Sequence, residues 1–66
     1  MKLSLTVDEF CKAHGISRAT FYELIKAGKG PATFKLGRLT RVSLDAERAW
    51  RESLEAQRAQ EHAQPA

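Results

Sequence analysis

Basic and aromatic side chains recur every four residues in one stretch of this sequence. Arg18, Tyr22 and Lys26 stand at positions i, i+4 and i+8, so on a helix they line a single face. A guanidinium, a phenol and an ammonium together can bind phosphates and base edges. The same pattern also fits an amphipathic helix whose polar face is only solvated. We favour binding of a polyanion, because further basic residues follow this stretch.

The basic residues of the chain are concentrated in its middle. Between Ser17 and Val42 six basic residues stand against one acid, a net charge of +5. The rest of the chain has five basic residues against seven acids, a net charge of −2, and the whole chain carries +3. This distribution is typical of a nucleic-acid-binding surface, although a solvated basic face would also show it.

The residue types needed for catalysis or metal binding do not form a set. Cys11 is the one cysteine, and the two histidines, His14 and His62, stand far apart in the sequence. Acids such as Asp8 and Asp45 occupy expected helix starts, where they favour the helix dipole. We therefore predict that the protein is not an enzyme, that it has no cofactor and no metal site, and that Cys11 is a core residue.

Two short helices joined by a sharp turn are predicted to position the basic face. Thr6 begins a capping box for a helix over residues 7–14, and Ser17 caps a second helix over residues 18–27. Gly15 can adopt the left-handed conformation that ends the first helix. Two capped helices about three residues apart indicate a helix-turn-helix. The expected core contacts of this region are Leu3, Leu5, Val7, Phe10, Cys11, His14, Phe21, Leu24 and Ile25.

A change of period after the Gly-rich breaker at residues 27–31 predicts a β-hairpin. Residues 33–36 and 39–42 flank Gly37-Arg38, a two-residue loop with glycine first, as a type II′ turn prefers. Thr40 and Val42 are expected to face the core. An isolated hairpin is barely stable, so it has to pack on the helices. Its basic residues would form one edge, or a flap whose charges are only solvated: Lys35, Arg38 and Arg41.

A third helix is predicted after the hairpin. Ser43 is its N-cap, Trp50 lies on its core-facing stripe with Ala46 and Leu54, and we expect it to end near Ala56. Residues 57–66 have no apolar periodicity and are predicted to form a flexible C-terminal tail. The expected organisation is one domain over residues 1–56 followed by this tail.

The length and composition of the chain limit its class. Sixty-six residues form one small domain with little core and no room for a large enclosed site. No apolar run approaches the ~18 residues needed to cross a membrane, and the N-terminus has an acid where a signal peptide would be apolar. We expect a protein that is cytoplasmic, associated with the nucleoid and not bound to a membrane.

The order of these elements resembles the small winged helix-turn-helix proteins of the excisionase/AlpA-like group, within the MerR-like superfamily. The resemblance covers about Leu5 to Leu54 and depends on TVDEFCKAHGISRATFYELIKAGKGP, on KLGRLTRVS as the wing, and on the pair Ala49-Trp50. His14 departs from it, since leucine is usual there. The full MerR regulators carry a dimerising coiled coil and an effector site, for which this chain is too short.

The resemblance implies a mainly α fold with a small β-hairpin, a winged helix-turn-helix. It implies that the second helix enters the major groove of double-stranded DNA and that the wing meets the adjacent minor groove. The implied contacts are Ser17, Arg18, Ala19, Tyr22 and Lys26 on the helix, and Lys35, Arg38 and Arg41 on the wing.

Three functions follow as expectations. The first is an excisionase-like recombination directionality factor of a mobile element, which binds DNA beside an attachment site as several cooperating copies, bends it and directs a site-specific integrase toward excision. The second is an AlpA-like transcriptional regulator of a prophage or integrative element. The third is a protein-interaction adaptor that does not bind DNA.

Overall fold

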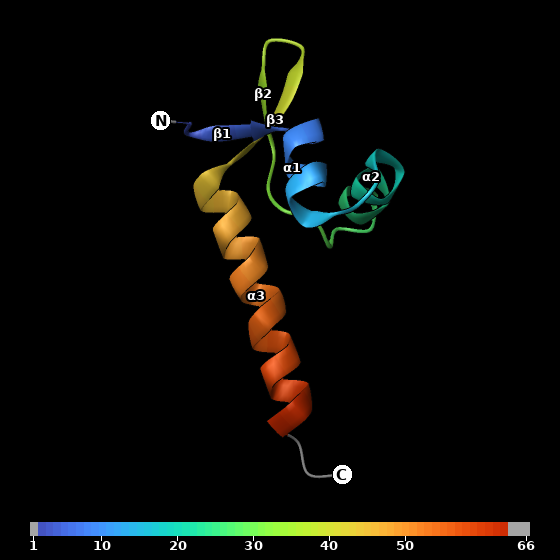
Figure 1. The fold of residues 1–66 in the computed structure, drawn as a ribbon, viewed down its shortest axis with the longest axis vertical. Coiled ribbons are helices and arrows are strands. Elements are labelled where there is room, and N and C mark those ends of the chain that lie inside the picture. Colours follow the sequence, from blue (N-terminus) through green and yellow to red (C-terminus); the bar gives the residue numbers. More distant parts are fainter. Residues whose placement is uncertain (1, 64–66) are drawn as a thin grey trace.

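The computed structural model describes the backbone of residues 2–63 and the side chains of residues 2–59. Within them the chain forms three helices and one three-stranded antiparallel sheet (Figure 1). This is the mainly α winged helix-turn-helix that the sequence predicts. In chain order the elements are β1 (Ser4–Thr6), α1 (Val7–His14), α2 (Arg18–Lys26), β2 (Phe34–Leu36), β3 (Leu39–Ser43) and α3 (Leu44–Ala63).

The helix-turn-helix forms as its capping residues predict. The backbone N–H of Glu9 donates to the Thr6 hydroxyl at 3.0 Å, and the N–H of Thr6 donates to the Glu9 carboxylate at 2.9 Å. Gly15 ends α1 with φ 68°, in the left-handed conformation. Ser17 then caps α2 by accepting a hydrogen bond from the N–H of Thr20. The turn between the two helices is therefore fixed at both ends by local hydrogen bonds.

The sheet contains one strand that the sequence analysis missed. β3 lies in the centre, with β2 on one side and β1 on the other, and Leu5 of β1 pairs with Val42 of β3. A strand of only three residues has no periodicity of its own, so its pairing with β3 decides its conformation. The predicted hairpin is confirmed: Leu36 opposes Leu39 across a two-residue loop, and Gly37 has a positive φ of 65°.

The core lies where α1, α2 and the sheet meet. Phe10 and Phe21 are fully buried with their ring centroids 5.3 Å apart. The buried hydrophobic side chains are Val7, Phe10, Cys11, Phe21 and Val42, with Leu5, Ile16, Ile25, Ala46 and Trp50 packed against them. Burial raises the pKa of the Cys11 thiol, which keeps it protonated as a core residue.

The expectation that Leu3 contacts the core is wrong. Its side chain is 76 % exposed, and Leu3 lies just before β1, so only its backbone contacts the rest of the fold. That carbonyl accepts a hydrogen bond from the N–H of Leu44 at 3.1 Å. Leu3 therefore ties the start of α3 to the N-terminal segment through its backbone and not through its side chain.

Helix α3 is longer than predicted. It continues to Ala63 instead of ending near Ala56, so residues 57–63 are helical and not a tail without secondary structure. Alanine, glutamate, glutamine and arginine have high helix propensity and extend a helix without an apolar stripe. Residues 64–66 of the predicted tail lie outside the described part. The C-terminal part of α3 extends away from the hairpin, at the other end of the molecule (Figure 1).

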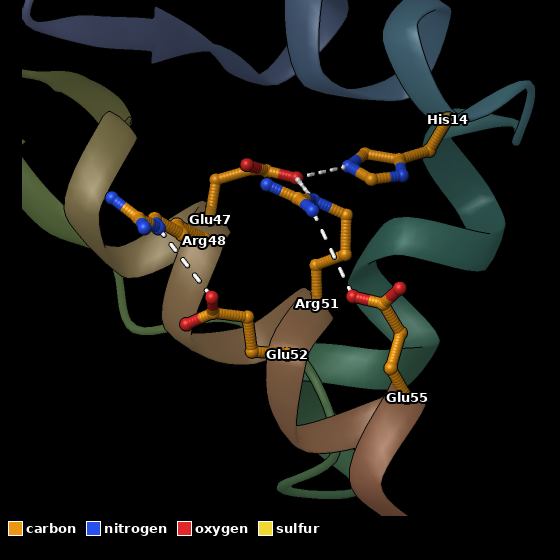
Figure 2. A network of polar contacts seen from close by, with 6 residues as sticks. All are labelled: His14, Glu47, Arg48, Arg51, Glu52 and Glu55. Carbon is orange, nitrogen blue, oxygen red and sulfur yellow. Dashed lines mark hydrogen bonds and ion pairs between the residues drawn. The ribbon is translucent and has the colours of Figure 1, made fainter. Parts of the chain in front are cut away.

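Two polar contacts among the described residues hold α3 to the helix-turn-helix. The indole N–H of Trp50 donates to the carbonyl of Lys29 at 2.8 Å, which fixes the loop after α2. His14, at the end of α1, donates to Glu47, which also accepts from Arg51 (Figure 2). No helix in the described part of the chain is long and apolar enough to cross a membrane.

Candidate nucleic-acid interface

Helix α2 presents the predicted polar face to solvent. Phe21 points into the core, and on the other side Arg18, Ala19, Tyr22 and Lys26 are exposed. The hydroxyl of Ser17 is also exposed, but it caps the helix and lies 3.0 Å from the hydroxyl of Thr20. The Ser17 side chain therefore has a structural role, because it caps the N-terminus of α2.

Arg18 is held by two neighbours. Its Nη1 donates to Oδ1 of Asp8, on the first turn of α1, at 2.6 Å. Its guanidinium carbon lies 5.7 Å from the ring centroid of Tyr22, a cation–π distance. The hydrogen bond to Asp8, reinforced by the charge of that carboxylate, raises the pKa of Arg18 above its ordinary value. Arg18 is therefore cationic, exposed and oriented.

A surface groove of about 440 Å³ joins α2 to the hairpin. Arg18 and Tyr22 line it from α2, and Lys35 and Arg38 line it from the hairpin. The structure thus brings together four of the side chains that the sequence analysis selected on two separate elements. Lys26 and Arg41 do not line this groove.

The hairpin carries its basic residues on two faces and not on one edge. Lys35 opposes Thr40 on β3 and donates to its hydroxyl at 2.8 Å, whereas Arg41 opposes Phe34. Directly opposed side chains of an antiparallel pair share a face, and neighbours along a strand alternate, so Lys35 and Arg41 point to opposite faces. The prediction of a single basic edge is wrong for this reason. The Nε of Arg41 is buried and lacks a hydrogen-bond partner among the described residues.

Two of the groove residues that the sequence does not predict as site residues contact its cationic side chains. The sequence predicts Asp8 only as an acid at a helix start and Thr40 only as a core-facing strand residue. Both line the groove, where each hydrogen-bonds a cationic side chain. Local spacing gives no signal for the contact of Asp8 with Arg18, because Asp8 is ten residues away and belongs to another helix. The contact of Thr40 with Lys35 follows from the predicted hairpin, in which the two residues oppose each other.

This arrangement can bind a polyanion by two elements at once. An exposed helix face that carries Arg, Tyr and Lys has the width and the donors for a major groove. A projecting hairpin with Lys35 and Arg38 beside that helix can reach the neighbouring backbone. Among the described residues no group of three or more His, Cys, Asp or Glu could hold a metal ion.

A comparison with protein families agrees with this geometry. The family described as a helix-turn-helix domain matches residues 4–54, which include every element from β1 to the first half of α3. The chain belongs to this helix-turn-helix family. No curated protein matches it as a relative.

Membership of the helix-turn-helix family identifies the chain as a DNA-binding domain. In a helix-turn-helix the second helix lies in the major groove and its N-terminal residues reach the base edges. Here that helix is α2, and Arg18 and Tyr22 stand in its first turns. The roles of the individual side chains of α2 and the hairpin toward DNA remain predictions.

Proposed function

We propose that this helix-turn-helix protein is an excisionase-like recombination directionality factor. It would bind DNA beside an attachment site as several adjacent copies, bend the duplex and direct a site-specific integrase toward excision. Its part in the reaction would be architectural, and we expect no catalytic activity of its own.

The observation that carries this proposal is the groove between α2 and the hairpin. Arg18 and Tyr22 on one wall and Lys35 and Arg38 on the other give one small chain two cationic elements for neighbouring grooves of a duplex. A protein that occupies a major groove and the adjacent minor groove together favours DNA whose minor groove is deformed. Bending is therefore the expected consequence of binding through both elements.

The size of the interface supports binding in several copies. A single module of this kind buries about 600–1,000 Å² on DNA, which is at the low end for a specific complex. One recognition helix contacts only a few base pairs. Neighbouring copies on repeated sites would supply the missing affinity if they contact one another, because each bound copy then favours binding of the next. Footprinting on the cognate region would report the spacing of such repeats.

The decisive experiment is an excision assay in vitro with a cognate site-specific integrase. We expect added protein to stimulate excision. In a gel-shift assay with circularly permuted duplexes, we expect the mobility of the complex to depend on the position of the binding site, as it does when a protein bends DNA. Repression of a neighbouring promoter without any stimulation of excision would instead indicate an AlpA-like transcriptional regulator. Failure to bind either cognate or random duplexes would indicate the protein-interaction adaptor.

A further inference from the structure

An acidic side chain lines the proposed DNA-binding groove. Asp8 is 74 % exposed and lies on the groove wall with Arg18, Tyr22 and Lys35. A carboxylate in this place repels phosphates and so weakens binding to any duplex. An exposed ion pair also contributes little to folding stability, so the pair with Arg18 is not needed to hold the fold.

The contacts of Asp8 restrict the guanidinium of Arg18. Asp8 accepts from Nη1 at 2.6 Å, while the Tyr22 ring lies 5.7 Å from the guanidinium carbon. Within the described residues, Asp8 and Tyr22 are the groups in contact with the Arg18 guanidinium. The hydrogen bond to Asp8 uses one N–H of Nη1. The Nε and Nη2 donors stay available, and two parallel N–H groups are what O6 and N7 of guanine accept.

We propose that Asp8 is a positioning residue, which fixes the Arg18 guanidinium for base recognition and at the same time weakens binding to unrelated sequences. A side chain ordered before binding loses less conformational entropy when it meets the correct base. The carboxylate also opposes complexes in which Arg18 turns to a phosphate, a repulsive element of the kind that specificity uses. This inference rests on the proposed DNA-binding function of α2.

The test compares Asp8→Asn with a matched control, Asp45→Asn. Both substitutions remove one exposed acid from the first turn of a helix. Each therefore changes the net charge by the same amount and removes one favourable interaction with a helix dipole. Only Asp8 lies in the groove with Arg18. Duplexes are selected from a randomised library by binding to each of four proteins: Asp8→Asn, Asp45→Asn, Arg18→Ala and the unchanged protein. The affinity of each protein is then measured on the selected duplex and on a scrambled duplex.

We expect Asp8→Asn to bind the scrambled duplex about two- to fivefold more tightly, since a charge near the phosphates is removed. At the base pair whose preference disappears in Arg18→Ala, we expect Asp8→Asn to lose about two- to tenfold of discrimination. Asp45→Asn should preserve that discrimination. In the free protein, the NMR relaxation of the Arg18 Nε–H should show faster motion in Asp8→Asn than in Asp45→Asn.

Two results would overturn the inference while leaving the proposed function intact. One is identical base preference and Arg18 mobility in the two Asn variants. The other is a preference lost by Asp8→Asn at a base pair that Arg18→Ala leaves unaffected, which would mean that Asp8 contacts a base itself. If the unchanged protein selects no duplex from the library, the proposed function and this inference fail together.

Discussion

His14 and Glu47 join the end of the first helix of the helix-turn-helix to the third helix. The Nε2 of His14 lies 2.9 Å from Oε2 of Glu47, and both side chains are largely buried, at 22 % and 16 % exposure. The same oxygen accepts from Nε of Arg51 at 3.1 Å (Figure 2). The His14 ring also contacts Phe10 and Trp50, with centroids 4.6 Å and 5.1 Å away. At position 14, where the family resemblance leads us to expect leucine, His14 makes a polar contact instead.

This contact makes stability depend on pH through Glu47. Burial acts to raise the pKa of Glu47, but hydrogen bonds from Arg51 and His14 outweigh it and lower the pKa below its ordinary value of 4.5. A lowered folded-state pKa stabilises the fold above the unfolded pKa, and that stabilisation is lost as the pH falls through the folded-state pKa. We expect Glu47→Gln to be less stable than the unchanged protein at pH 7, and the difference to shrink below pH 4.5. Urea unfolding between pH 3 and 7 measures it.

The matched control is Glu52→Gln. Glu52 pairs with Arg48 at 3.5 Å on the same helix, but its side chain is 59 % exposed. An exposed pair contributes little, so this variant should follow the unchanged protein at every pH. A constant stability difference between Glu47→Gln and the unchanged protein over the whole range would contradict the role given to Glu47.

Trp50 should stabilise the fold through its indole N–H. In Trp50→Phe the hydrogen bond to the Lys29 carbonyl is lost while an aromatic ring remains beside Phe10. We expect a loss of about 1–2 kcal/mol in the free energy of unfolding, measured in urea. Leu54→Ala, on the same helix but 43 % exposed, should cost less. Equal losses in the two variants would show that the hydrogen bond is not the cause.

Glycine at position 15 should stabilise the fold only because it adopts the left-handed backbone conformation without strain. Its φ is +68°, and a Cβ added there would meet no atom within 4 Å. Gly15→Ala should therefore lower stability by about 1 kcal/mol through the left-handed conformation and not through a clash. Gly15→Asn should cost less, because asparagine tolerates that region better. Thermal unfolding measures both, and an alanine variant as stable as the unchanged protein would disprove the explanation.

Local patterns were sufficient to predict most of the fold. Capping residues such as Thr6 and Ser17 act within three positions of sequence, so the starts of α1 and α2 could be predicted, as could the Gly37-Arg38 turn. Strand β1 could not, because its pairing partner β3 is more than thirty residues away. The end of α3 was placed too early because helix propensity continued the helix after its apolar stripe had stopped.

The candidate site was predicted as residue types but not as an arrangement. Helical spacing placed Arg18 and Tyr22 on the exposed face of α2, since that face is opposite the buried Phe21. The groove needs the packing of α1 against both α2 and the sheet, so spacing alone did not bring Asp8 to Arg18. The division of Lys35 and Arg41 between two faces, by contrast, follows from the register that the Gly37-Arg38 turn sets between β2 and β3, so the predicted hairpin already implied it.

That division leads to a prediction about the hairpin as a wing. A hairpin inserted into a minor groove turns its two faces toward the two phosphate backbones, so Lys35 and Arg41 would each neutralise one phosphate. We expect Lys35→Ala and Arg41→Ala each to reduce the slope of log affinity against log salt by about 0.9. Fluorescence anisotropy on one duplex at several salt concentrations measures this slope.

Arg58→Ala is the control for this prediction. It removes the same charge from the C-terminal half of α3. That half of the helix extends away from the hairpin (Figure 1), so the slope of this variant should match that of the unchanged protein. If Lys35→Ala reduces the slope and Arg41→Ala does not, only the hairpin face that carries Lys35 contacts DNA. The hairpin would then lie along the DNA backbone instead of entering the minor groove. If neither changes the slope, the hairpin takes no part in binding and α2 alone carries the contact with DNA.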